Sequence, residues 1–370
     1  MKLTNLCTRD IIKRLGFVEK TTPFSVSVLI PTYQRAYLLD HVLDALTKQN
    51  YKDFEVVIIL KPSGDGTEDV IQKYSRLLNL NLVIQAKGYI VNALDLGLEN
   101  ASGDIIIFLD DDAIPFPNMV QTYLDTYTLP NVGGVAGDVI PAALTHCKIL
   151  PFLEPSSELV PSCKPFMAML ARKLWLSPIT GLEDNLVYLS KAGVVEYDYE
   201  IGQIAKGNLT KSLLGMGANM SILKKTVEDF RFPNSWIRGL SWEQFLGWYI
   251  HKKGYSLLFN PEIRVYHIHH GQTLSRNITE EKKEILRWTE NNLLFYRLWN
   301  LEPDISKMHR LFWLLYETVV DVSKICRKKE LTRLPRLKSR FYSEIIGLKW
   351  ILSKKVKGNY NPLIDLEKLC

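Results

Sequence analysis

The sequence has few cysteines and no long apolar run, and these absences exclude several classes of protein. Its 370 residues include five scattered cysteines and no Cys-x-x-Cys pair, which indicates a reducing compartment rather than a disulfide framework. No stretch of about 18 apolar residues occurs, so no membrane-spanning helix is expected. The first 17 residues lack the apolar core of a secretory signal. These features predict a cytoplasmic protein.

The charge is small overall but unevenly distributed. A composition of 46% hydrophobic and 23% charged residues is typical of a globular chain, and the net charge is +6. Between residues 324 and 357, however, there are twelve Lys and Arg against two acidic residues. Such a basic block favours an anionic surface, either phospholipid or nucleic acid.

Residues 26 to 109 alternate between short apolar runs and helical apolar stripes. Four strands and three helices are expected, in the order βαβαβαβ, and the last strand is a continuous apolar run. This order predicts an α/β fold with a doubly wound, mostly parallel sheet whose ligands bind at the carboxyl ends of the strands. The expected strands are 26–30, 55–60, 82–85 and 104–109, and the expected helices are 37–48, 67–78 with Thr67 as N-cap, and 90–100.

The rest of the chain is less regular until its helical end. Residues 117–214 are expected to form strands and loops, followed by a helix at 242–253 and a strand at 263–267. From residue 280 the pattern predicts helices with breaks near Pro303 and Pro335. We therefore expect an N-terminal extension (1–24), a catalytic domain (25–275) and a basic amphipathic helical region (276–370).

Three consecutive carboxylates, Asp110, Asp111 and Asp112, follow the apolar strand 104–109. Unless a cation or hydrogen-bond donors are close, such carboxylates repel one another. Hard oxygen ligands at this edge suit Mg²⁺ or Mn²⁺ bound to a diphosphate. Alternation along an extended chain would place Asp110 and Asp112 on one side and Asp111 on the other.

Four segments in order resemble the family 2 glycosyltransferases of GT-A fold. They are residues 28–35 (VLIPTYQR), 63–67 (SGDGT), 101–104 (ASGD) and 108–112 (FLDDD), and the resemblance covers about residues 25 to 275. It implies inverting transfer of a sugar from a nucleotide-sugar to an acceptor hydroxyl. It also implies that Asp110 and Asp111 bind the donor together with Pro31, Thr32, Tyr33 and Arg35, and that Asp112 and Asp110 hold the metal, with His267 as a further ligand.

The family's catalytic base is a Glu-Asp pair that opens a helix, and here Trp242 and Glu243 stand at that place. Both residues depart from the family pattern. A Glu beside Trp can still act as a base, because apolar surroundings raise a carboxyl pKa toward neutrality. Alternatively, Glu243 serves only to stabilise the first turn of the helix.

Two further segments bear on donor and acceptor. Where the family often has an Asp-Asp pair that contacts uracil, this chain has Leu60 and Lys61. The sequence therefore does not indicate which nucleobase the donor carries. Residues 215–220 (GMGANM) resemble the acceptor-side turn, with Gly217 and Asn219 beside Trp242; an ordinary strand connection is the alternative.

Apolar and aromatic residues alternate with Lys and Arg in the last helices. This mixture suits a helix in an anionic membrane interface, while packing on the catalytic domain is the alternative. No nucleic-acid module is found in the sequence, so nucleic acid is not expected as a partner. The expected location is cytoplasmic, with a peripheral place on the cytosolic face of a membrane if the tail binds lipid.

Together these features predict a metal-dependent glycosyltransferase that acts in cell-surface or lipid-linked glycan synthesis, with a glycan or lipid-linked glycan as acceptor. A polyprenyl-phosphate sugar synthase, which needs no hydroxyl base, is one alternative. A non-catalytic sugar-binding or scaffold protein is the other.

Overall fold

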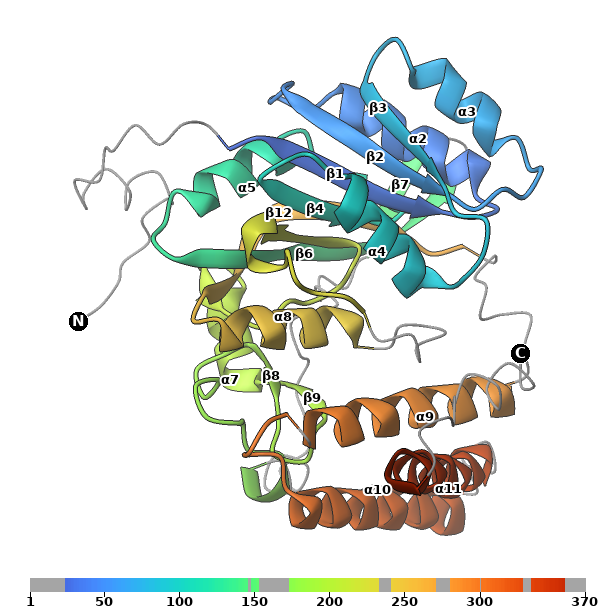
Figure 1. Ribbon diagram of the computed structural model, residues 1–370, viewed down its shortest axis with the longest axis vertical. Helices are drawn as coiled ribbons and strands as arrows, with labels where there is room; N and C mark the ends of the chain where they lie inside the picture. Colours follow the sequence, from blue (N-terminus) through green and yellow to red (C-terminus); the bar gives the residue numbers. More distant parts are fainter. Residues whose placement is uncertain are drawn as a thin grey trace.

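The computed structural model describes residues 24–145, 148–152, 173–232, 241–270, 280–299, 301–328 and 334–356. The expected N-terminal extension lies outside the described residues, except for Phe24. Figure 1 shows a large twisted sheet at one end of the molecule and three long helices at the other.

The centre of the structure is a ten-stranded sheet in the order β10-β12-β6-β11-β4-β1-β2-β3, with β5 paired to β12 and β7 to β6. The strands β1, β2, β3 and β4 are parallel, as the sequence predicts. The strands are β1 (Val26–Thr32), β2 (Phe54–Leu60), β3 (Asn79–Ile84), β4 (Ile105–Leu109), β5 (Ala113–Pro115), β6 (Val132–Thr145), β7 (Lys148–Pro151), β10 (Thr210–Lys211), β11 (Asn219–Leu223) and β12 (Ser256–Ile268). A separate hairpin pairs β8 (Val187–Leu189) with β9 (Val195–Tyr197).

Helices cover both faces of the sheet. The helices in the described part of the chain are α2 (Ala36–Thr47), α3 (Thr67–Tyr74), α4 (Ile90–Asn100), α5 (Met119–Tyr127), α7 (Tyr199–Ala205), the 3₁₀ turn η1 (Lys224–Thr226), α8 (Trp242–Lys252), α9 (Glu280–Trp299), α10 (Lys307–Lys328) and α11 (Leu334–Val356). Alternate residues of β1 enter different cores: Val28 and Ile30 pack with α2, α3 and α5, whereas Leu29 packs with α4 and α8. This double burial explains why the strands read as continuous apolar runs.

The sheet is mostly parallel, as the sequence predicts, and strand β11 runs antiparallel between β4 and β6. The expected breaks in the last helices are also found: α9 ends at Trp299 and α10 begins at Lys307, around Pro303, and Pro335 lies in the first turn of α11, where a missing N–H costs no hydrogen bond.

Two details differ from the expectations. The N-cap of α3 is Gly66 at φ 87°, not Thr67, whose hydroxyl instead donates to Asp65 at 2.6 Å. The stretch of strands and loops predicted after residue 117 also contains the helix α5, and its 14-residue strand β6 has three glycines and a proline that obscure the alternation of a strand.

The long helix α9 shares a core with the sheet. Its Leu294, Phe295 and Leu298 belong to the same buried cluster as Leu29 and residues of β8. Trp288 on α9 then packs against Trp313 on α10 with ring centroids 5.4 Å apart. The boundary that we expect near residue 275 therefore does not separate two independent cores.

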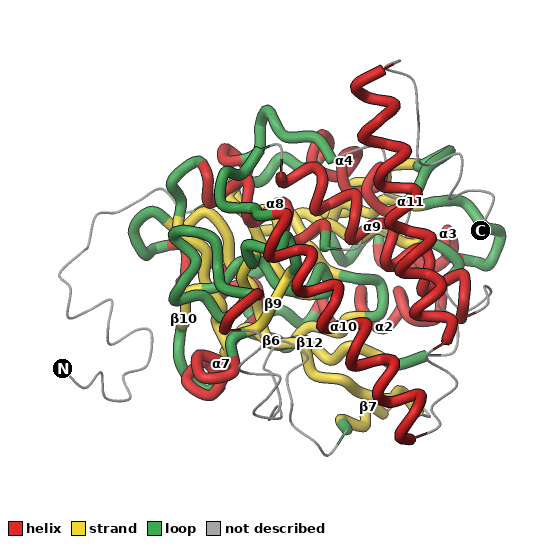
Figure 2. Tube along the Cα trace, turned by 90° about the horizontal axis from the view of Figure 1, so that it is seen from below, coloured by secondary structure: helices red, strands yellow, loops and turns green. Residues whose placement is uncertain are grey.

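Helices α10 and α11 lie beyond α9, on its side away from the sheet, in both views (Figures 1 and 2). None of the helices in the described part of the chain combines the length and apolarity that a membrane span requires.

Candidate active site

The site lies where β1 and β4 end side by side. These two strands are parallel neighbours, so the residues that follow them meet at one edge of the sheet. After β1 the chain turns into α2 through Arg35, and after β4 it enters the turn that begins at Asp110. Both segments that the sequence singles out are thus brought together.

The three aspartates form a tight turn rather than the extended chain that we expect. The turn is closed by a hydrogen bond from the backbone N–H of Ala113 to the carbonyl of Asp110, at 3.1 Å. Arg35 spans its inner side: Nη1 lies 2.6 Å from Asp111 Oδ1 and 2.7 Å from Asp112 Oδ2. The guanidinium offsets part of the repulsion among the carboxylates.

Asp110, Asp112 and His267 form a cluster that fits a divalent cation. One ligand atom of each lies within 4.8 Å of the other two. His267 is on β12, opposite Ala113, so antiparallel pairing with β5 carries the imidazole to the turn. Asp112 Oδ1 is buried and accepts no well-formed hydrogen bond; His267 Nε2 is 3.3 Å away. A buried carboxylate oxygen beside a second carboxylate and an imidazole is a donor set suited to Mn²⁺ or Mg²⁺.

His270 also contacts this cluster, although the sequence points to His267 as the histidine ligand. Its Nε2 lies 2.8 Å from Asp112 Oδ2, closer than His267 lies to Oδ1. Strand β12 ends at Ile268, so the side chains after it no longer alternate between the two faces of the sheet. Residues 267–270 (HIHH) contain three histidines. Only the position at which β12 ends shows which of them turn toward Asp112.

The environment separates the acidities of the three carboxyls. Burial, and then the charge of Asp112, raises the pKa of Asp110 above its ordinary value. Burial likewise raises the pKa of Asp111, although the charge of Arg35 opposes this. Burial acts in the same direction on Asp112, but its close contacts with the imidazoles of His267 and His270 outweigh burial and hold that pKa below the usual range. The cluster therefore concentrates negative charge on Asp112.

Glu243 lies across from these acids in the first turn of α8. Its Oε1 accepts a hydrogen bond from the backbone N–H of Gly217 at 3.1 Å. Burial raises its pKa to about 8, and the charge of Asp110 contributes in the same direction. Glu243 thus lies within electrostatic reach of the aspartate turn, although the two come from elements more than 130 residues apart.

Trp242 and Gly217 fix this carboxyl in place. The indole is buried against Phe108 of β4 and Phe232, with ring centroids 5.3 and 5.5 Å away. A Cβ added at Gly217 would lie 2.6 Å from the Trp242 ring, so glycine is needed for the close approach. Gln244 then ties α8 to the preceding loop by donating to the carbonyls of Leu214 and Gly215.

Asn219 has a different environment from its expected acceptor-side neighbours. Its side chain has no exposed surface. The amide donates to the carbonyls of Asp138 and Ile263, and its oxygen accepts from Tyr123 at 2.8 Å. These bonds tie β11, β6, β12 and α5 together, and the structure does not bring the side chain into the space beside Glu243.

The segments expected to bind the donor line the other side of the site. Pro31 and Thr32 end β1, and Tyr33 follows with Lys61 Nζ 5.2 Å from its ring centroid. Lys61 also donates to the carbonyl of Gly88 at 3.1 Å. Asp65 accepts from the backbone N–H of Ala36 at 3.0 Å and so fastens the loop after β2 to the start of α2.

Comparison with known proteins identifies the class of the fold and a family that part of the chain resembles. The architecture is that of the GT-A glycosyltransferases. A mannosyltransferase structure from Pyrobaculum calidifontis, in complex with GDP-Man and Mn²⁺, superposes with a TM-score of 0.50 at 16% identity, over 92% of this chain and 93% of that one. Residues 27–142, the segment from β1 into β6, match the family described as glycosyl transferase family 2.

Curated relatives resemble part of the chain. A validoxylamine A glucosyltransferase from Streptomyces hygroscopicus is 38% identical over 109 residues, which are 28% of this chain and 26% of the relative. A GalNAc(5)-diNAcBac-PP-undecaprenol beta-1,3-glucosyltransferase from Campylobacter jejuni is 33% identical over 94 residues, or 24% of this chain and 29% of the relative. This chain thus spans less than a third of either relative.

Proposed function

We propose that the protein is an inverting glycosyltransferase that moves a sugar from a nucleotide-sugar to an acceptor hydroxyl. The observation that carries this proposal is the placement of Glu243, a buried carboxyl with a pKa of about 8, beside a three-ligand cation cluster. A general base near its operating pH and a site for a diphosphate-bound cation are the two parts that such a transfer needs.

Each group has a role that follows from its position. Asp110, Asp112 and His267 would hold Mg²⁺ or Mn²⁺, which, when bound, neutralises the charge that grows on the leaving diphosphate. Arg35 keeps Asp111 and Asp112 in place, and Pro31, Thr32 and Tyr33 line the nucleotide side. Gly217 N–H orients the Glu243 carboxylate, which takes the proton of the acceptor hydroxyl. Trp242 excludes water from that carboxyl and so keeps its pKa high.

The proposed acceptor is a glycan or a lipid-linked glycan. The Campylobacter relative is named for an undecaprenol-diphosphate-linked acceptor, which supports the lipid-linked form. The proposed location is cytoplasmic, and a lipid-linked acceptor would place the protein peripherally on the cytosolic face of a membrane.

The test measures donor binding and transfer separately. Thermal unfolding is followed with UDP, GDP and dTDP and their sugars, each with and without Mn²⁺. We expect one nucleotide-sugar to stabilise the wild type only when Mn²⁺ is present, because a ligand that binds the folded state raises its stability. Asp112→Asn removes this stabilisation, whereas Asp53→Asn, at an exposed carboxylate just before β2 and so at the opposite end of that strand from the site, leaves it unchanged.

Glu243→Gln then separates the proposed reaction from its alternatives. We expect this variant to bind the donor but to lose transfer to a hydroxyl. Retained transfer would instead indicate a phosphate acceptor, as in a polyprenyl-phosphate sugar synthase. Donor binding without any turnover in the wild type would indicate a sugar-binding protein, and no stabilisation by any nucleotide would refute the proposal.

A further inference from the structure

The exposed face of α10 carries apolar residues where a helix in water carries charges. From residue 307 to 326 the exposed side chains are Lys307, Met308, Leu311, Phe312, Leu315, Val319, Val322 and Cys326. Spacings of three and four residues place them along one stripe. Val319, the most exposed of the apolar ones, has 66% of its surface accessible.

The exposed face of α11 has the same character. Its exposed side chains, among those that the structure describes, are Leu334, Lys338, Phe341, Tyr342, Ile345 and Lys349. Phe341 is 75% exposed, and lysines lie one turn or so before and two turns after it. Neither exposed face contains a carboxylate within its described positions. We call these two faces together the α10–α11 face.

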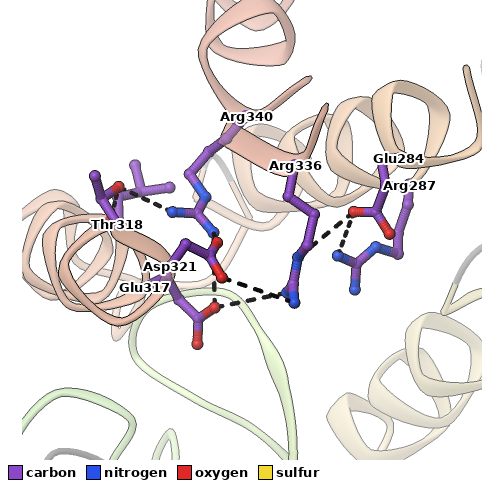
Figure 3. A network of polar contacts seen from close by, with 8 residues as sticks. Glu284, Arg287, Glu317, Thr318, Asp321, Arg336 and Arg340 are labelled. Carbon is purple, nitrogen blue, oxygen red and sulfur yellow. Dashed lines mark hydrogen bonds and ion pairs between the residues drawn. The ribbon is translucent and has the colours of Figure 1, made fainter. Parts of the chain in front are cut away.

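Arginines and carboxylates of these helices pair with one another instead. Arg340 of α11 contacts Asp321 of α10 at 2.8 Å, and Arg336 lies 3.8 Å from Glu317 (Figure 3). Arg336 also reaches Glu284 of α9 at 3.7 Å, so the network joins all three helices. Asp321 has no exposed surface. The helices thus place ion pairs inside and apolar side chains outside, the reverse of the usual pattern for a helix in water.

Aromatic side chains from another part of the chain extend the face. Trp175 stacks on Phe312 with ring centroids 6.1 Å apart and also contacts Tyr316 at 5.8 Å. Its neighbour Leu174 is more than half exposed. An apolar surface of this extent marks a contact with another body.

We propose that the α10–α11 face binds the surface of an anionic lipid bilayer, with both helices lying in the plane of the interface. Charge complementarity selects this occupant: the face offers apolar side chains and the lysines Lys307, Lys338 and Lys349, which suit acyl chains and anionic headgroups respectively. A second copy of the chain would present the same lysines and no described carboxylate to meet them. The inward ion pairs fit helices that lie on the bilayer rather than cross it.

This contact is independent of the proposed sugar transfer, so its test contains no nucleotide. The full chain is sedimented with vesicles of phosphatidylglycerol and phosphatidylcholine, or of phosphatidylcholine alone. We expect binding to the anionic vesicles that weakens as salt rises, since headgroup attraction is screened. Each of Lys338→Gln and Lys349→Gln should weaken partitioning about fivefold, the effect of about one interfacial lysine.

Substitutions on the apolar stripe provide the sharper comparison. Val319→Glu should reduce vesicle binding by about tenfold or more, while Leu77→Glu, at a residue that is equally exposed but lies beside the β2–β3 edge, should leave it unchanged. Because both side chains are largely exposed, both variants should unfold at the wild-type temperature.

Three outcomes would overturn the proposal. Wild-type protein that stays in the supernatant with anionic vesicles excludes lipid binding. Equal losses in Val319→Glu and Leu77→Glu show that the α10–α11 face is not the contact. A dimer that Val319→Glu converts to a monomer in analytical ultracentrifugation, with vesicle binding unchanged, assigns the face to a second copy instead.

Discussion

The buried carboxyl of Glu243 makes a prediction about stability that does not depend on any activity. Its pKa is raised from 4.5 to about 8 because the folded protein buries it. The folded state therefore keeps a proton that the unfolded chain releases near pH 4.5. Stability falls as the pH rises between these two values, since the folded state binds more protons in that range. Glu243→Gln removes this titration but keeps the shape of the side chain.

The size of the effect follows from the pKa shift. At about 1.36 kcal/mol per pKa unit, the wild type loses about 3 kcal/mol relative to Glu243→Gln by pH 7 and about 5 kcal/mol above pH 8. The free energy of unfolding is measured by urea denaturation from pH 5 to pH 9 for both proteins. The difference between them should grow by about 4 kcal/mol over this range.

Parallel pH profiles for the two proteins would refute the assignment of a buried, protonated Glu243. The same pKa predicts the rate of transfer if Glu243 is the base. Only about a tenth of the molecules carry the carboxylate at pH 7, so the rate should rise about fivefold by pH 8 and about tenfold by pH 9, where it levels off. A rate of transfer that does not change over this pH range would show that Glu243 is not the base, and it would leave the prediction about stability unaffected.

Three further predictions concern the framework of the site. Gly103→Ala should destabilise the protein by about 1 to 3 kcal/mol in urea denaturation, because its Cβ would lie 2.5 Å from the backbone nitrogen of Ser27, whereas Gly207→Ala, with open space around it, should be neutral. Glu55 accepts hydrogen bonds from Ser27 and Ser102, and these outweigh burial and lower its pKa. Glu55→Gln should therefore be less stable than the wild type above about pH 5, and this difference in the free energy of unfolding should vanish as the pH falls below about 4. A difference that does not depend on pH would refute this. Asn219→Leu should cost about 2 to 4 kcal/mol by calorimetry, since Tyr123 and two carbonyls lose buried partners, and a smaller loss would show that these bonds are dispensable.

The parallel part of the sheet and its helices can be predicted from the sequence, because short segments of the chain contain the patterns that indicate them. The strands β1, β2 and β4 are short apolar runs, and the stripe of α2 has a helical period, so their order and type can be predicted without knowledge of contacts. The long strand β6 was missed because its glycines and prolines are typical of loops. Only pairing with β11 and β12 keeps those residues extended.

The candidate site, too, could be predicted from the sequence only in part. The run of three aspartates after an apolar strand is visible in the sequence, and so is the match of Glu243 to the family's base. Their mutual placement is not visible, because it requires β11 to insert antiparallel beside β4 and Trp242 to pack on Phe108. The same holds for His270, whose contact with Asp112 depends on where β12 ends.

The αβ order, the run of three aspartates and the concentration of basic residues near the carboxyl end can be predicted from the sequence alone, since each is a property of neighbouring residues. What these features contact depends on the folded structure. Burial raises the pKa of Glu243, Arg35 bridges two of the aspartates, and Arg340 of α11 pairs with the buried Asp321 of α10 while apolar side chains of both helices are exposed. The acidity of a carboxyl and the exposure of a helix face depend on atoms that are distant in the chain, and only folding brings those atoms together.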